Sequence, residues 1–182
     1  AHFGLCGIIE LQSDWVLQGL ARALEVETDE PWAYIQSDRT GKQRSYIEEF
    51  GFIWREAKVR IASGHVGNVA DFPRTHRHQP YVATFNSGNF DFRFLLIHTR
   101  WTTEPERAAE VAQIARDFHW FQTLTTERDV ILAVDFNYPP TSPKMGPFRN
   151  LPDTVNLIPA GTLTTLKASG QGFSSWYDHL YV

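Results

Sequence analysis

The sequence has a single cysteine, no excess of basic residues and no long apolar run. With Cys6 as the one cysteine among 182 residues, a disulfide within the chain and a Cys-rich structural zinc site are both excluded. The 17 basic and 21 acidic residues give a formal charge of −4, which excludes a polybasic protein that holds nucleic acid by bulk charge. An enzyme that reaches a polyanion through bound metal ions is compatible with this charge.

No apolar run reaches membrane-spanning length, and the first residues show no signal-peptide pattern, so we expect a soluble protein. The sequence is rich in apolar residues: it is 42% hydrophobic and 14% aromatic, with 13 Phe and 6 Trp. A chain of this size and composition builds one substantial core, and no internal repeat or linker divides it. Residues 1–182 are therefore expected to form a single domain.

Strands outnumber helices in the sequence pattern, with the helices inserted between them. Apolar runs and alternations predict strands over residues 5–10, 32–36, 48–54, 58–61, 81–85, 92–98, 129–135 and 177–182. Helices are expected over residues 14–25, capped by Ser13, and over 103–123, where Thr103 and Glu106 begin the first turn. Residues 64–79 and 138–160 have no periodicity and are interpreted as loops. The fold class is mixed α/β (α+β), in layers.

Polar side chains recur where the predicted strands end, at Glu10, His98, Asp135 and Asp178. Taken singly, an acid at a strand end is more often solvated than a metal ligand, and His98 could be a core histidine. The run from Asp135 to Asn137 is more specific, because alternation puts these two side chains on one side and Phe136 on the other. A carboxylate and an amide oxygen that converge suit a hard cation such as Mg²⁺.

His76 and His78 lie two residues apart in an arginine-rich segment. They could form a zinc pair, but a solvated basic loop that contacts phosphates is the favoured interpretation. Trp101 could either stack on a base or cover a sheet edge. The other aromatic side chains at helix and strand positions are interpreted as core, namely Trp15, Trp54, Phe118, Trp120 and Phe121.

Several of these segments resemble motifs of the endonuclease/exonuclease/phosphatase superfamily, the DNase I-like proteins. VILAV followed by Asp135, Phe136 and Asn137 resembles the family's Gly-Asp-Phe-Asn signature, with Val134 in place of the glycine. CGIIELQ resembles the strand that ends in the metal-binding glutamate, which the resemblance assigns to Glu10.

Further segments resemble the family in the same order along the chain. WAYIQSDRTG and SYIEEFGFIWR resemble a DNase I segment in which a tyrosine contacts DNA and a glutamate orients the catalytic histidine, roles that would fall to Tyr46 and Glu48. LLIHTRW resembles the strand that carries that histidine, here His98. DFPRTHRHQPYVATF resembles the Phe-x-Arg-x-Pro stretch with an insertion, so the phosphate-binding arginine would be Arg74 or Arg77.

The last segment, TLTTLKASGQGFSSWYDHLYV, resembles the Thr-rich approach to a Tyr-Asp strand and gives Asp178. Asp178-His179 also resembles the family's closing Asp-His, but the preceding tyrosine and threonines favour the earlier motif. Family domains open with a strand bearing an asparagine ligand and close with a Ser-Asp-His strand, and the sequence contains neither. The expected fold is therefore a DNase I-like layered β-sandwich flanked by helices and truncated at both ends.

The resemblance implies a Mg²⁺-dependent phosphodiesterase, with Mn²⁺ or Ca²⁺ as alternative ions. Its catalytic set would be Glu48, His98, Asp135, Asn137 and Asp178. We expect a nuclease that acts on DNA in preference to RNA. The alternatives are a superfamily phosphoesterase for a phospholipid, phosphoinositide or nucleotide, and a non-catalytic truncated member or fragment. Exposed sheet edges could also pair in a homo-oligomer.

Overall fold

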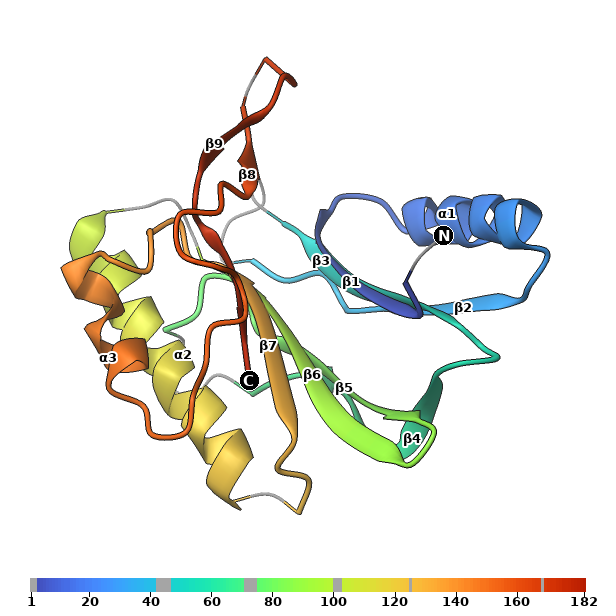
Figure 1. Cartoon of the computed structure of the whole chain (residues 1–182), viewed down its shortest axis with the longest axis horizontal. Helices are drawn as coiled ribbons and strands as arrows, with labels where there is room; N and C mark the ends of the chain where they lie inside the picture. The colour runs from blue at the N-terminus through green and yellow to red at the C-terminus, as the bar shows by residue number, and fades with distance from the viewer. Residues whose placement is uncertain (1–2, 42–46, 71–74, 100–102, 125, 168) are drawn as a thin grey trace.

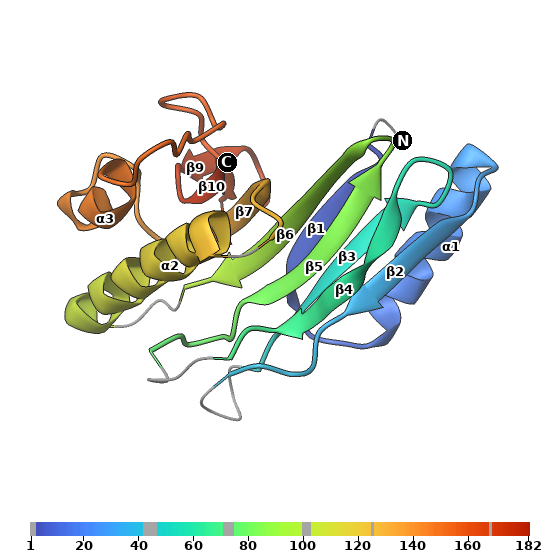
Figure 2. The same ribbon diagram turned by 90° about the horizontal axis from the view of Figure 1, so that it is seen from below.

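Two β-sheets face each other, and helices cover their outer faces. The computed structural model describes residues 3–41, 47–70, 75–99, 103–124, 126–167 and 169–182. Figure 1 shows α1 on one side of the molecule and α2 with α3 on the other, with the sheets between them. The view from below shows the same layers (Figure 2). The predicted mixed α/β sandwich is confirmed.

The smaller sheet contains β1 (Leu5–Leu11), β2 (Trp32–Gln36) and β3 (Glu49–Arg55), in the order β1-β3-β2, and all its pairs are antiparallel. Helix α1 (Trp15–Thr28) packs on its outer face, where Ala21 contacts a small cluster that includes Trp32 and Ile53. These two residues lie on neighbouring strands. The helix is therefore held to the sheet by its apolar side.

The larger sheet has the order β10-β7-β6-β5-β4. Its strands are β4 (Arg60–Asn68), β5 (Tyr81–Ser87), β6 (Phe90–His98), β7 (Val130–Asp135) and β10 (Asp178–Tyr181). Strands β6 and β7 are parallel, and the connection between them contains the helix α2 (Glu104–Leu124). That helix buries Val111, Ile114 and Phe118 against the sheet as the sequence predicts.

The core between the sheets is aromatic. Phe52 of β3 lies 5.1 Å from Phe85 and 5.2 Å from Phe94, measured between ring centroids. The sheets pack closely at Gly7 of β1, where a Cβ atom would meet the side chain of Leu96 of β6 at 2.4 Å. This packing fixes the end of β1 beside the ends of β6 and β7, which is where the polar strand-end residues lie.

The structure differs from the sequence predictions at several elements. Strand β4 extends to Asn68, into the segment predicted to be a loop, because it pairs with β5 across a register shift. The region 138–160 contains a 3₁₀ turn, η1 (Pro143–Met145), and the short helix α3 (Gly146–Arg149). A hairpin of β8 (Thr165–Leu166) and β9 (Phe173–Ser175) was not predicted, and it projects from the body of the molecule (Figure 1).

Three local predictions are wrong. Helix α1 begins after Asp14 rather than Ser13, and no side chain caps it. Trp15 and Trp120 are not core residues, since 71% and 48% of their surfaces are exposed. Both lie on helices, and helical period alone does not distinguish an exposed aromatic side chain from a buried one. Among the described helices, none combines the length and apolarity needed to cross a membrane.

Candidate active site

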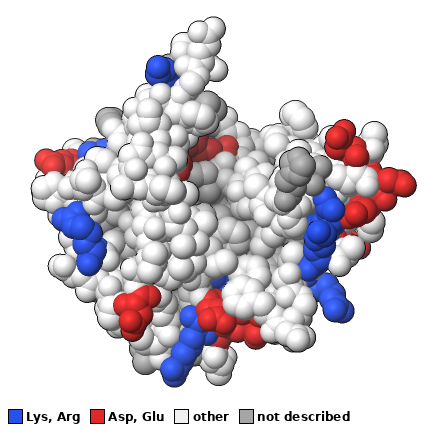
Figure 3. Space-filling model, in the orientation of Figure 1, with Lys and Arg blue, Asp and Glu red and all other residues white. Residues whose placement is uncertain are grey.

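The ends of three strands meet at one edge of the larger sheet. His98 is the last residue of β6 and is paired in register with Asp135, the last residue of β7. Asp178, the first residue of the antiparallel β10, is also paired with Asp135. Figure 3 shows acidic side chains gathered in a hollow beside the base of the β8–β9 hairpin. We call Glu10, Glu48, His98 and Asp135 the strand-end cluster.

A tight turn after β7 presents Asp135 and Asn137 on the same side. The backbone N–H of Asn137 donates to Oδ1 of Asp135 at 2.7 Å, and its side-chain Nδ2 donates to the carbonyl oxygen of Thr99 at 2.8 Å. Asn137 has a φ of 54°, in the left-handed region that asparagine tolerates better than most residues. The fully buried Phe136 anchors the turn against Phe148. The turn thus links the ends of β6 and β7.

Glu10 reaches the same place from the smaller sheet. It lies in a register shift between Ile8 and Leu11 of β1, with a φ of 62°. A left-handed glutamate costs on the order of 1 kcal/mol, and such strain is typical of positions where a side chain must be aimed. Its Oε1 lies 3.7 Å from Nε2 of His98, and the side chain is 54% exposed, so it lines the open side of the cluster.

His98 is held between two sets of carboxylates. Its Nδ1 donates to Oε2 of Glu48 at 2.8 Å, whereas its Nε2 lies 4.0 Å from Oδ2 of Asp135. Glu48 is positioned by a backbone bridge to Thr40 just before β3. A histidine whose one nitrogen is fixed by a carboxylate presents the other nitrogen in a defined direction. Here that direction is toward Glu10 and Asp135.

The opposite charges of His98 and Glu48 stabilise each other. Burial works to lower the pKa of His98, but the hydrogen bond and charge of Glu48, with Asp135 and Glu10, raise it above its ordinary value. For Glu48, burial works to raise the pKa, yet the hydrogen bond from His98 and nearby positive charges lower it. Both directions favour an imidazolium beside a carboxylate at neutral pH.

At Asp135, unlike at His98 and Glu48, the surroundings favour the neutral form of the side chain. Burial, followed by the neighbouring charges of Asp178 and Glu10, raises its pKa to about 6, although the N–H of Asn137 and the charge of His98 work to lower it. Asp178 itself is fixed by Thr165, whose hydroxyl donates to its Oδ2 at 3.2 Å. Carboxylates gathered around a buried acid make a site that a cation would stabilise.

His78 lies beside this cluster and was missed as a member of it. It is 2% exposed, its ring is nearly parallel to that of His98 with centroids 5.8 Å apart, and its Nε2 lies 3.8 Å from Oε2 of Glu48. His76 faces elsewhere, toward Asp117 of α2 at 2.6 Å. The predicted solvated loop is therefore wrong, because both histidines are buried, and they have different partners. Nothing in the sequence distinguishes this burial from exposure.

The predicted phosphate contacts are only partly visible. Tyr46, Arg74 and Trp101 lie outside the described residues. Arg77 is 4% exposed, and its backbone N–H donates to Glu110 of α2. Its positive charge acts on Glu48 and His78, lowering the pKa of each after the larger effects of burial and their nearer partners.

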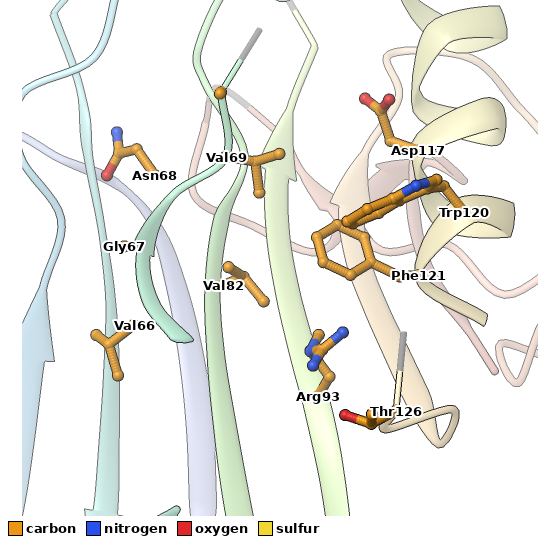
Figure 4. Close-up of a pocket in the computed structure, with 11 residues that line it drawn as sticks. Val66, Gly67, Asn68, Val69, Val82, Arg93, Asp117, Trp120, Phe121 and Thr126 are labelled. Carbon is orange, nitrogen blue, oxygen red and sulfur yellow. The ribbon is translucent and has the colours of Figure 1, made fainter. Parts of the chain in front are cut away.

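A cavity of about 890 Å³ lies away from the cluster, between β4 and the C-terminal part of α2. Figure 4 shows Trp120, Phe121 and Asp117 of α2 on one side and strand residues, including Val82, on the other. Among the described residues, its lining contains none of the predicted site residues. We therefore place the candidate active site at the strand ends, where the titratable groups meet, rather than in this cavity.

Comparisons with known proteins bear on the fold. No model of a known protein family matches the sequence. A curated relative, a deoxyribonuclease from Thioalkalivibrio sp. (strain K90mix), is 28% identical over 187 residues, which cover all of this chain and 50% of the relative. The chain thus spans half the length of that relative.

Solved structures match at lower identity but over nearly the whole chain. An endonuclease/exonuclease/phosphatase family protein from Bacteroides thetaiotaomicron superposes with a TM-score of 0.70 at 15% identity, covering 99% of this chain and 69% of that one. The fold is DNase I-like. The same fold is found in D. rerio TDP2 complexed with a single-strand DNA product, which superposes with a TM-score of 0.66 at 14% identity. That match covers 98% of this chain and 70% of the TDP2 chain. A mannosyl-6-phosphatase from Bacteroides thetaiotaomicron superposes with a TM-score of 0.67 at 15% identity. The match covers 98% of this chain and 70% of that one.

Proposed function

We propose that this chain is a metal-dependent phosphodiesterase that hydrolyses DNA. The observation that carries the proposal is the convergence of Glu10, His98 and Asp135, from three different strands, with Glu48 fixing the histidine. The deoxyribonuclease name of the 28% identical relative supports nucleic acid as the substrate class. The proposal also treats residues 1–182 as one domain.

The donor set fits a divalent cation. One ligand atom from each of Glu10, His98 and Asp135 lies within 4.8 Å of the others, and Glu10 faces solvent. Burial, and after it the negative charges of Asp178 and Glu10, raise the pKa of Asp135, and a cation beside this carboxylate would offset both effects. Carboxylate oxygens are the ligands that Mg²⁺ prefers, so Glu10 would hold the ion, with Asp135 beside it. When bound, the ion would neutralise charge on the phosphoryl oxygens.

The remaining side chains have complementary roles in this proposal. Asp135 would orient the attacking water and accept its proton, because its carboxyl has a pKa of about 6 and ionises near neutral pH. His98, kept cationic by Glu48, would donate from Nε2 to a phosphate oxygen or to the leaving oxygen. Asn137 would hold the phosphate from the turn, and Asp178 would keep the strand end acidic. Arg74 or Arg77 would contact a further phosphate.

The test is nicking of supercoiled plasmid DNA by the purified chain, with Mg²⁺ or Mn²⁺ and with EDTA. We expect metal-dependent nicking that Asp135→Asn reduces by at least about 100-fold, since it removes the group that accepts the proton. Glu27→Gln, at an exposed position of α1, makes the same chemical change outside the cluster and should leave the rate unchanged. Equal rates for the wild type and Asp135→Asn would contradict the proposal.

Other substrates distinguish the alternatives. A phosphoesterase for small molecules would leave plasmid intact but release phosphate from a panel of nucleotides, sugar phosphates and phosphoinositides. The mannosyl-6-phosphatase with the same fold is the specific reason to include sugar phosphates. If the folded chain has no detectable activity on any of these substrates with metal present, a non-catalytic role is favoured.

A further inference from the structure

His78 is set up like a metal ligand rather than like a surface histidine. Its Nδ1 lies 3.2 Å from the carbonyl oxygen of Thr40, which can only accept a hydrogen bond. A histidine that donates from Nδ1 to a backbone carbonyl carries its lone pair on Nε2, which is the usual support for a metal-binding imidazole. The hydroxyl of Thr40, at 3.4 Å from Nδ1, is the more distant partner.

That lone pair faces negative charge. Nε2 of His78 lies 3.8 Å from Oε2 of Glu48, the same oxygen that accepts the hydrogen bond from His98. Two acceptors turned toward each other in a buried place repel unless a cation lies between them.

We propose that Glu48, His78 and His98 form a second metal site, selective for a borderline transition ion such as Zn²⁺ and distinct from the Glu10–Asp135 side of the cluster. One ligand atom from each of the three residues lies within 4.8 Å of the others. Zn²⁺–ligand distances of about 2.0–2.2 Å bring tetrahedral ligands to roughly 3.4 Å apart, so small side-chain rotations close the site. Two imidazoles and one carboxylate leave a fourth position for water.

The ligand atoms of this site differ in kind from those of the site proposed for Mg²⁺. Imidazole nitrogens suit Zn²⁺ and its neighbours, whereas Mg²⁺ prefers oxygen and keeps its waters. The positive charge of Arg77, which acts on both Glu48 and His78, disfavours any ion held by charge alone. Binding therefore depends on the two nitrogen bonds.

Occupation of this site would inhibit the proposed reaction. A Zn²⁺ ion bound at Nδ1 of His98 replaces the proton there, which is released to solvent, and the hydrogen bond from His98 to Glu48 is lost. His98 then no longer carries the charge that Glu48 stabilises. This consequence rests on the proposed function, but the binding itself does not.

Zn²⁺ binding is measured by titration calorimetry on the metal-stripped full chain in excess Mg²⁺. We expect one tight site in the wild type and in Glu10→Gln, and an affinity at least about 10-fold weaker in His78→Gln. His119→Gln, on α2, is the matched control and should bind as the wild type does. Unchanged affinity in His78→Gln, or loss of binding in Glu10→Gln alone, would overturn the proposal.

Imidazole ¹⁵N chemical shifts of the wild type give a readout that needs no folded variant. Zn²⁺ should shift one nitrogen of His78 and one of His98 and leave His119 unchanged; a shift of His98 without His78 would contradict the site. In the plasmid assay, Zn²⁺ should inhibit the wild type more strongly than His78→Gln. If no variant nicks DNA, the proposed function fails while calorimetry and ¹⁵N shifts still test the metal site.

Discussion

Two histidine–carboxylate pairs in this molecule have nearly the same hydrogen-bond geometry and different surroundings. His98 and Glu48 are 2.8 Å apart, with side chains 14% and 13% exposed, and the free face of the imidazole turns toward Glu10. His76 and Asp117 are 2.6 Å apart, with exposures of 1% and 23%, and they tie the segment before β5 to α2. A short contact therefore does not identify a catalytic pair. The second nitrogen of His98 faces Glu10 and Asp135 at an open strand end, and this convergence is what points to chemistry.

The largest expected effect comes from removing the charge that holds His98. Glu48→Gln keeps the size of the side chain but no longer stabilises an imidazolium, so the pKa of His98 should fall and plasmid nicking should drop by about 10²–10⁴-fold. The fold should tolerate the change, since the amide oxygen still accepts the hydrogen bond. The nicking rate measures the effect on activity and thermal unfolding measures the effect on stability, with Glu27→Gln as the control variant for each. A rate within a few-fold of the wild type would remove Glu48 from the site.

A second effect concerns pH and comes from Asp135. Because the pKa of this carboxyl rises from 3.8 to about 6 on folding, its contribution to stability is fully present below about pH 4 and is lost as the pH rises through 6. Asp135→Asn mimics the protonated form. Without metal, the variant should match the wild type at low pH and exceed its free energy of unfolding at pH 8, by at most about 3 kcal/mol.

Urea unfolding at the two pH values measures this difference. Addition of Mg²⁺ at pH 8 should stabilise the wild type and not the variant, because the ion favours the ionised carboxylate. A variant that is less stable than the wild type at pH 8 without metal would show that Asp135 is held by attractive contacts rather than by a site built for a cation.

The smallest of the three effects tests the pair on α2. Asp117→Asn weakens a charge-assisted contact to a buried histidine and should lower the free energy of unfolding by about 1–3 kcal/mol. Nicking per folded molecule should stay at the wild-type value, since neither Asp117 nor His76 faces the strand-end cluster. Loss of activity without loss of stability would show that the Asp117–His76 pair also takes part in the reaction.

The elements with strong periodicity were predictable, and so were the ends that carry the cluster. The β7 strand and its Asp135-Phe136-Asn137 turn follow from an apolar run that stops at an acid, and α2 follows from its apolar spacing and its Thr103–Glu106 start. The partnership of His98 with Glu48 came from the family resemblance, because the two residues are 50 positions apart and no local pattern joins them.

The remainder depends on tertiary contacts. The β8–β9 hairpin has threonine, serine and glycine where a strand pattern would show alternation, and its pairing comes from backbone hydrogen bonds. The sequence around His78 is that of a basic loop, yet the histidine is buried with its ring beside those of Phe50 and His98. Trp120 has the period of a core residue but lies at the rim of the cavity in Figure 4.

The most direct test of the central claim compares His98→Gln with His76→Gln in the same plasmid assay, with rates divided by the folded fraction from circular dichroism. We expect His98→Gln to be folded and at least about 100-fold less active, and His76→Gln to be destabilised but active per folded molecule. The reverse result, an active His98→Gln or an inactive, stable His76→Gln, would contradict the assignment of the active site to the strand-end cluster.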